Sequence, residues 1–481
     1  MIMPGDKPMT WPKHVGWLLG ALLFASGCAS ITLNAGFDEV RAGVGERTGS
    51  QLFWNNGTEL DKEAAEQLDS LLRRRLTADD AVQIALLNNR ELQAVYSDLG
   101  VAQADLVQAG LLSNPIFDAA VIFPVRGGGR PDLELGAAMN FLNIFYIPLR
   151  KRVAAARFEE AKTRVTGAVL DFAGRVRGAF YAYEADEQML ELRQTIVQAL
   201  DASFEIARRL STAGNIADLE LARERAQFEA AKLALRAAEI SVRQSREELN
   251  VLMGLWGAQT QWQSAGRLPE IPEQTLETKD IERLALERSL DLVQARQRII
   301  GAGEELGLTR WRTLLPDFSA GPKGERNDGA WEVGPQLEFS IPLFDQGQAR
   351  AGRTAAELRR LQQEYYALAV RVRAQARQAR DRLEGGSDRA IYYRDILLPL
   401  HERIVNEAQL QYNAMQLGPF QLLRAREQQI QTAAAYIEAL RDYWLARGDF
   451  GQLLSGRLPS SGAAPARTTS GQTRMNQSEG H

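Results

Sequence analysis

The stretch from Trp331 to Gly352 most constrains the fold, because a strand pattern changes to a helix pattern within it. From Trp331 to Ile341 the odd positions hold apolar or proline residues and the even ones polar residues or glycine, which is the alternation of a strand with two unlike faces. Pro342 then removes a backbone donor, Asp345 is a candidate helix N-cap, and from Gln348 the chain is rich in Ala, Arg, Glu and Leu. This stretch predicts a strand that leads directly into a long helix.

The same junction occurs earlier in the chain, so the unit is duplicated. Ile147-Pro148-Leu149 is the counterpart of Ile341-Pro342-Leu343, and Ala222-Arg223-Glu224 is the counterpart of Ala425-Arg426-Glu427. Matches that recur in the same order predict an internal repeat with an offset of about 200 residues.

Two strands are predicted in each repeat. The expected strands are 116–123, 133–141, 317–324 and 331–341. The glycine-rich segment from Arg126 to Pro131 reads as a hairpin turn, because no Gly-Lys-Ser/Thr follows as in a phosphate-binding loop. Pro322 and two glycines dilute the third pattern, which makes it the weakest of the four.

Each repeat also contains a pair of long helices. The expected helices are 149–213, 218–253, 345–416 and 420–455. No proline interrupts the first one, which would extend for about 100 Å. Gly385-Gly386-Ser387 and Pro399 are expected to interrupt the third.

A row of alanines favours an antiparallel coiled-coil hairpin in the first repeat. Ala222, Ala226, Ala230 and Ala234 recur at a spacing of four residues. Small side chains in such a row allow two helix backbones to approach closely.

The N-terminus resembles the signal of a bacterial lipoprotein. Basic residues precede an apolar run from Val15 to Ala25, which is too short to cross a bilayer as a helix. Ala25-Ser26-Gly27-Cys28 follows and resembles a lipobox, which implies cleavage before Cys28 and its lipidation; a plain secretory signal is the alternative. The same resemblance implies an outer-membrane address, because Ala29 is not the Asp that retains lipoproteins in the inner membrane.

These features divide the chain into six parts. Thr77 and Asp80 form a capping-box pattern that is expected to open a helix running toward Leu112. The expected parts are a signal peptide at 1–27, an N-terminal lipidated segment at 28–76, repeats at 77–256 and 277–456 joined by a connector at 257–276, and a disordered tail at 457–481.

The composition excludes several function classes. A formal net charge of −4 and a pI near 5.8 do not suggest a nucleic-acid-binding surface. His14, His401, His481 and one cysteine are too few for a Cys/His metal cluster, and no His-Glu-x-x-His or Gly-x-Ser-x-Gly motif occurs. Glu159-Glu160 and Glu304-Glu305 are expected on solvated helix faces. We therefore expect no catalytic residues, no metal and no cofactor.

The strands instead predict a membrane pore. Glu134, Glu332 and Glu338 occupy the polar face and are candidates for a wet lumen, although a small soluble sheet is the alternative. Because lipid does not tolerate an open sheet edge, a closed barrel needs about eight strands or more. Four strands in one chain therefore require oligomerisation, without choosing among two, three or four copies.

The duplicated pattern resembles that of the TolC-type outer-membrane efflux channels over about residues 77–456. The resemblance is carried by Ala85-Leu86, Asn88-Asn89, Leu92, Ala109-Gly110-Leu111-Leu112, Asn114-Pro115, Ile341-Pro342-Leu343-Phe344-Asp345, Gly347, Leu417-Gly418, Leu422 and Ala425. It implies a mainly α fold with a β part: a homotrimer with a twelve-stranded outer-membrane β-barrel continuous with a periplasmic α-helical barrel. One departure is that Arg150-Lys151-Arg152 stands where the second repeat has Phe344-Asp345-Gln346.

The resemblance places function at the ends of the helices. It implies that the turns at their far tips contact a periplasmic adaptor, and through it an inner-membrane pump. The expected tip residues are Ala213, Gly214, Asn215, Leu417 and Gly418. Charged residues one turn further in are candidates for a gate, since rings of charge at a constriction select ions. These gate candidates are Asp218, Glu220, Arg223, Arg424 and Glu427.

The sequence thus predicts a passive exit duct of a tripartite efflux pump in the outer membrane of a Gram-negative bacterium. The alternative is a periplasmic coiled-coil adaptor lipoprotein without a pore. A cell-wall hydrolase is a third possibility, and it would need an acid/base pair in a cleft.

Overall fold

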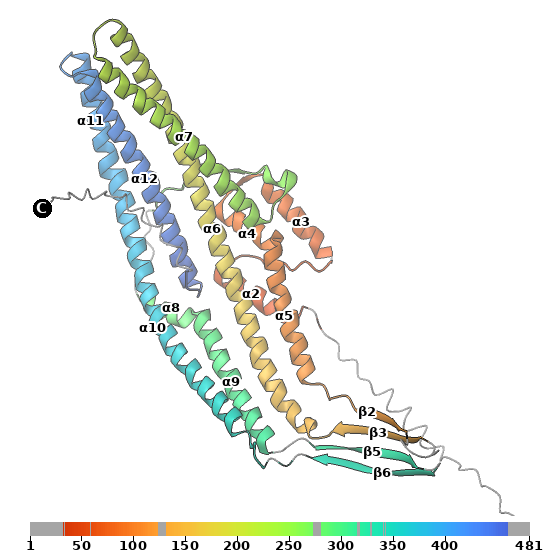
Figure 1. Cartoon of the computed structure of the whole chain (residues 1–481). Coiled ribbons are helices and arrows are strands. Elements are labelled where there is room, and N and C mark those ends of the chain that lie inside the picture. Colours follow the sequence, from red (N-terminus) through yellow and green to blue (C-terminus); the bar gives the residue numbers. More distant parts are fainter. Residues whose placement is uncertain are drawn as a thin grey trace, which may run out of the picture.

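The computed structural model describes residues 32, 34–57, 59–123, 131–272, 280–314, 318–327, 330–339, 341 and 343–459. In Figure 1 these residues form an elongated molecule with a β-sheet at one end and the turns of two long helical hairpins at the other. Cys28 and its signal, the turn at 126–130, Pro342 and the tail from 460 lie outside the described residues.

All four predicted strands form one antiparallel sheet. Strand β2 (Ile116–Ile122) pairs with β3 (Asp132–Asn140), and β5 (Phe318–Asn327) pairs with β6 (Ala330–Phe339). Strands β3 and β5 join the two hairpins, so the order is β2-β3-β5-β6. Strand β5 is longer than predicted, and its Pro322 lies opposite Pro335 of β6.

Long helices continue from the sheet. In the first repeat, α6 (Asn143–Thr212) and α7 (Asp218–Met253) form an antiparallel hairpin. In the second, α10 (Gln348–Tyr392), a π-helix (Tyr393–Leu397) and α11 (Leu398–Asn413) form one rod that pairs with α12 (Pro419–Leu454). No helix in the described part of the chain is both long enough and apolar enough to cross a membrane.

The prediction that Pro148 marks the first strand-to-helix junction is wrong. Helix α6 begins at Asn143, and Pro148 lies exposed in its second turn. Packing explains the earlier start, because Tyr146 forms a small apolar cluster with Val153 and with Leu308 of the neighbouring helix. Burial of these side chains outweighs the single helical hydrogen bond that a proline removes.

Asp345 does not cap α10 as predicted. Its carboxylate accepts a hydrogen bond from the backbone N–H of Gly347 at 2.8 Å and forms an ion pair with Arg350 at 3.1 Å. Gly347 itself is the N-cap, in the left-handed region at φ 71°. The turn before the helix therefore uses the Asp345 side chain, and the helix end is left without a side-chain cap.

The third long helix is not interrupted where the glycines stand. It continues through residues 385–387, and Gly386 lies against α12, where an added Cβ would make an ordinary contact 3.5 Å from the Tyr443 Cα. The irregularity is the π-helix, which precedes Pro399. A proline cannot donate to the residue four positions earlier, and a wider turn accommodates that loss.

The predicted alanine row does not lie at the hairpin interface. Ala222, Ala226 and Ala230 are exposed, whereas α7 buries Glu224, Ala231 and Ala238 along its first two-thirds. These three positions recur every seven residues, which is the repeat of a left-handed coiled coil. The hairpin was predicted correctly, but its contact face was assigned to the wrong side of the helix.

The N-terminal segment belongs to the main core. Helices α2 (Phe37–Thr48) and α3 (Glu59–Leu72) pack with α4 (Ala78–Asn88) and α5 (Arg90–Ala109) against the middle of α6. The capping box of Thr77 and Asp80 is confirmed. The helix expected to run on toward Leu112 is instead divided at Asn89, whose side chain accepts from the Leu92 N–H at 3.0 Å and caps α5.

The duplication is visible at two places in each repeat: at the break in the helices that precede the strands, and at the end of the last long helix. Ser289 divides α8 (Ile281–Arg288) from α9 (Leu290–Leu314) as Asn89 divides α4 from α5. Gly254 follows α7 beside Asn88 and Asn89, and Gly456 follows α12 beside Arg288, both at positive φ. The connector adds η1 (Gly257–Thr260) and β4 (Gln263–Ser264), which pairs with β1 (Arg75–Leu76).

We predict that Gly456→Ala destabilises the protein by at least about 2 kcal/mol. Its φ is +95°, and a Cβ there would lie 2.1 Å from the Arg288 carbonyl oxygen, a backbone atom that cannot move aside cheaply. Gly451→Ala is the control, since a Cβ at that helical position meets nothing within 4 Å. Thermal unfolding of both variants checks this; similar melting temperatures would contradict it.

Candidate functional site

One face of the sheet is lined by carboxylates. Residues directly opposite one another in an antiparallel pair share a face, and the register places Glu134 opposite Glu325 and Glu325 opposite Glu332. The acidic residues on this face are Asp118, Asp132, Glu134, Glu325, Glu332 and Glu338. Lys323 lies on the same face and pairs with Glu134 at 2.9 Å.

The other face of the sheet is mostly apolar. It carries side chains that are exposed in the single chain, namely Phe117, Val121, Leu135, Trp331, Val333, Leu337 and Phe339. Phe117 is 77% and Val333 74% exposed, which would be costly in water. A sheet with one carboxylate face and one apolar face fits a wall between water and lipid.

Both edges of the sheet are open within the chain. Strands β2 and β6 each have one neighbour, so one side of each strand has no ladder partner among the described residues. Unpaired backbone groups in lipid cost several kcal/mol each, so this sheet is incomplete as a membrane wall until other strands join it.

The turns at the far tips differ between the two repeats. In the first, Gly214 takes φ 74° and the Asn215 N–H donates to the Leu210 carbonyl at 2.8 Å. In the second, the left-handed residue is Met415 at φ 57°, and Gly418 is an ordinary N-cap at φ −77°. The glycine of the second tip is therefore not the residue that takes the left-handed conformation in that turn.

The gate candidates lie in the first three turns of α7 and α12 but do not meet within the chain. Glu220 pairs with Arg223 on the same helix at 2.7 Å, and Glu427 accepts from Gln431 at 3.3 Å. Asp218 and Arg424 are exposed. No ion pair in the described part of the chain joins the α7 set to the α12 set, so a ring that uses both would need other copies of the chain.

A small apolar groove separates the two hairpins near their tips. It has a volume of about 100 Å³ and lies between α6, the end of α11 and the start of α12. Its lining is Ser203, Ile206, Ala207, Leu210, Tyr412, Pro419, Phe420, Leu422 and Leu423.

Sequence reasoning missed two buried carboxylates in the helices. Glu224 is 6% exposed and accepts from the Ser203 Oγ at 2.7 Å across the α6–α7 interface. Glu184 is 2% exposed. Its burial, and to a smaller extent the nearby charge of Glu187, raise the pKa of its carboxyl to about 8. A hydrogen bond accepted from the Ala265 N–H acts in the opposite direction and lowers the pKa by less than burial raises it. The heptad spacing to Ala231 is a signal that points to Glu224, whereas no local pattern marks Glu184.

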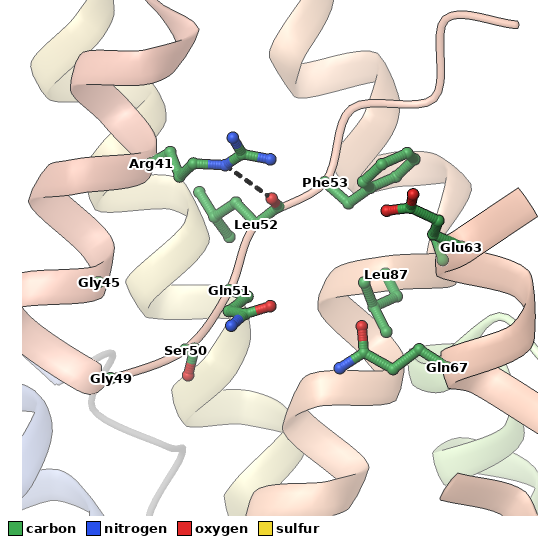
Figure 2. Close-up of a pocket in the computed structure, with 11 residues that line it drawn as sticks. Arg41, Gly45, Gly49, Ser50, Gln51, Leu52, Phe53, Glu63, Gln67 and Leu87 are labelled. Carbon is green, nitrogen blue, oxygen red and sulfur yellow. Dashed lines mark hydrogen bonds between the residues drawn. The ribbon is translucent and has the colours of Figure 1, made fainter. Parts of the chain in front are cut away.

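Two larger cavities lie away from the tips. One of about 500 Å³ is partly open to solvent and is lined by α2, the segment after it, α3 and α4. Figure 2 shows Arg41 donating to the Leu52 carbonyl, and Glu63 is the one carboxylate among the lining residues. The other, also about 500 Å³, lies between α6, α9 and α10. Its carboxylates all pair with arginines, in the pairs Arg298–Glu160, Arg157–Glu305, Arg360–Glu357 and Arg360–Glu364.

Neither cavity holds two free carboxylates side by side. The described residues also include no group of three His, Cys, Asp or Glu side chains arranged to hold a metal ion.

Comparison with known proteins agrees with this geometry. Residues 146–255 match the profile of the family described as "Outer membrane efflux protein". The cobalt-zinc-cadmium resistance protein CzcC of Cupriavidus metallidurans is 21% identical over 398 residues, which cover 79% of this chain and 90% of that protein.

Solved structures show the same fold. The outer-membrane channel OprN has a TM-score of 0.65 at 17% identity and covers 82% of this chain and 92% of its own. The Campylobacter jejuni CmeC outer membrane channel has a TM-score of 0.62 at 15% identity and covers 86% and 93%. The resemblance to TolC-type outer-membrane efflux channels and the mainly α fold with a small sheet are confirmed.

We predict that Glu184→Gln flattens the pH dependence of stability. The ordinary pKa of the group is 4.5, so the unfolded chain releases this proton first, and the stability of the wild type falls as pH rises from about 4.5 to about 8. The glutamine variant lacks this loss, on the order of 3 kcal/mol, and is relatively more stable above pH 8. Melting temperatures at pH 5 and pH 9 test this. Glu248→Gln, at an exposed position, should leave the wild-type dependence unchanged.

Proposed function

We propose that this chain is the outer-membrane exit duct of a tripartite efflux pump. The observation that carries the proposal is the open four-stranded sheet with one carboxylate face and one apolar face, continuous with two long helical hairpins. The apolar face lies against lipid, and Glu134, Glu332 and Glu338 line the lumen together with Glu325. Solutes pass through the duct passively, and an inner-membrane transporter supplies the energy.

The duct is a homotrimer. Three copies contribute twelve strands, with β6 of one chain paired to β2 of the next, so that no edge faces lipid. The helical hairpins then form a second barrel that extends into the periplasm.

Cys28 anchors each copy in the outer membrane by its lipid. The barrel provides the main attachment, and the lipid adds to it. This arrangement suits the outer membrane of a Gram-negative bacterium, where β-barrels are the usual spanning structures.

The partners are a periplasmic adaptor and, through it, an inner-membrane pump. The adaptor contacts the tips at Ala213, Gly214 and Asn215 and at Leu417 and Gly418, and the apolar groove beside them offers further buried area. Met415, 95% exposed at the second tip, is an additional contact that the sequence did not single out.

The gate lies one turn inside the tips. In a trimer, Asp218, Glu220, Arg223, Arg424 and Glu427 each recur three times around the axis, and contacts between copies supply the ion pairs that a single chain lacks. Breaking such pairs opens the constriction without a change in the membrane end.

We propose that the chain is not an enzyme. The described cavities lack the paired carboxylates that a cell-wall hydrolase needs, because each carboxylate is single or held by an arginine. An adaptor without a pore is disfavoured by the two-faced sheet. The name of the relative CzcC mentions cobalt, zinc and cadmium, so the substrate is to be identified by testing a deletion strain first against these metals and then against drugs.

We predict intermolecular disulfides between the edge strands. Cysteines introduced in a Cys28→Ala background at Val121 of β2 and, in a register scan, along β6 should give oxidised dimers and trimers on denaturing gels. Matched pairs in β3 and β5 should give only intramolecular bonds, because these strands pair within one chain. Absence of higher bands for every edge pair would contradict the barrel.

We also predict stepwise, cation-selective conductance from the purified oligomer in planar bilayers. The triple change Glu134→Gln, Glu332→Gln and Glu338→Gln should move the reversal potential in a salt gradient toward zero, because charge lining a pore sets its ion preference. Glu248→Gln should not. Absence of conductance steps, also when Glu220 and Glu427 are neutralised to open the gate, would refute the duct.

A further inference from the structure

A basic band surrounds the junction between sheet and helices. It comprises residues 141–153, 308–312, 341 and 343–353, here called the collar, which Figure 1 shows at the sheet-proximal ends of α6, α9 and α10. The collar contains seven Lys and Arg residues and one Asp, in a chain whose net charge is −4. The basic residues are Arg150, Lys151, Arg152, Arg310, Arg312, Arg350 and Arg353.

Much of this charge is not neutralised by the protein. Arg350 pairs with Asp345, and Arg152 lies 3.5 Å from the carboxylate of Glu304. Lys151, Arg310 and Arg353 are exposed and have no ion pair in the part of the chain that the structure describes. Their charge is therefore available to an external anion.

Large apolar side chains stand exposed among these charges. Phe344 is 92% and Phe145 69% exposed. The others are Ile144, Trp311, Ile341 and Leu343. Aromatic and aliphatic groups mixed with Lys and Arg are typical of the membrane–water interface, where the apolar groups enter the acyl region and the charges meet headgroup phosphates.

We propose that the collar binds the phosphate groups of anionic glycerophospholipids in the periplasmic leaflet of the outer membrane. The inference rests on the proposed function, which places the sheet in the membrane and the helices in the periplasm. Because the collar lies at the junction between sheet and helices, it is at the level of those headgroups. Each exposed basic residue near an anionic lipid surface strengthens association by about fivefold, so three of them give about a hundredfold preference over a neutral lipid.

The lipid fits the collar better than a solute in transit does. Exposed phenylalanines such as Phe344 are unfavourable in a water-filled lumen, and the lumen face of the adjoining sheet carries charge of the opposite sign. The collar thus faces lipid, and its basic residues fix the height of the barrel in the bilayer.

Trp311 provides a reporter for the test. Full-length protein is reconstituted in phosphatidylcholine vesicles with increasing fractions of brominated phosphatidylglycerol or brominated phosphatidylcholine, and quenching at Trp311 is obtained as the difference from a Trp311→Phe variant. We expect brominated phosphatidylglycerol to quench at much lower fractions than brominated phosphatidylcholine, and raised salt to reduce the difference. Equal quenching by the two lipids in the wild type would overturn the proposal.

Matched variants locate the effect. Lys151→Gln, Arg310→Gln and Arg353→Gln together should abolish the preference, by about a hundredfold, while Lys151→Arg, Arg310→Lys and Arg353→Lys should keep it. The control removes three exposed arginines near the far tips, through Arg225→Gln, Arg403→Gln and Arg426→Gln, and should also keep it.

Conductance measured in neutral bilayers distinguishes failure of the collar proposal from failure of the proposed duct. If the collar variant still conducts but retains the lipid preference, the collar inference fails and the duct stands. If it changes ion selectivity and keeps the preference, the collar lines the conduit and the inference also fails. If neither the wild type nor the variant with Glu220 and Glu427 neutralised conducts, the duct itself fails.

Discussion

Lipid offers the backbone no hydrogen-bond partner, and in the proposed duct this constraint governs the sheet from which the rest of the structure extends. Strands β2 and β6 each leave a row of backbone groups unpaired in the single chain, and only further strands can pair them without water. The helices follow almost directly, since β3 ends at Asn140 and α6 begins at Asn143. In the proposed trimer, closing the sheet with other copies therefore also arranges the long helices around the same axis.

Stability and function are separated along the length of the molecule. The main core lies near the middle, where the N-terminal helices and α4 and α5 cover α6, and a second core lies where α8, α10 and α12 meet. The tips bury few side chains: α11 buries only Val405 among its residues. The ends can thus change their contacts at small cost, while the middle holds the two repeats together.

Acidic and basic side chains also occupy different parts of the molecule. Carboxylates occupy one face of the sheet, and basic residues collect at its junction with the helices. Alternation along single strands identified Glu134, Glu332 and Glu338, but not Glu325, because Pro322 and two glycines obscure the pattern of β5. Glu325 is found only through the register, which sets it between Glu134 and Glu332.

The sequence by itself determined the order of strands and helices, the duplication and the two tips, because periodicity and turn residues act over a few neighbouring positions. Only the tertiary structure decided that α6 starts before Pro148, that Ala231 and Ala238 rather than Ala222 form the hairpin contact, and that Glu184 is buried. Each of these depends on a partner distant in sequence, and the free energy of burying side chains against that partner outweighs local preference.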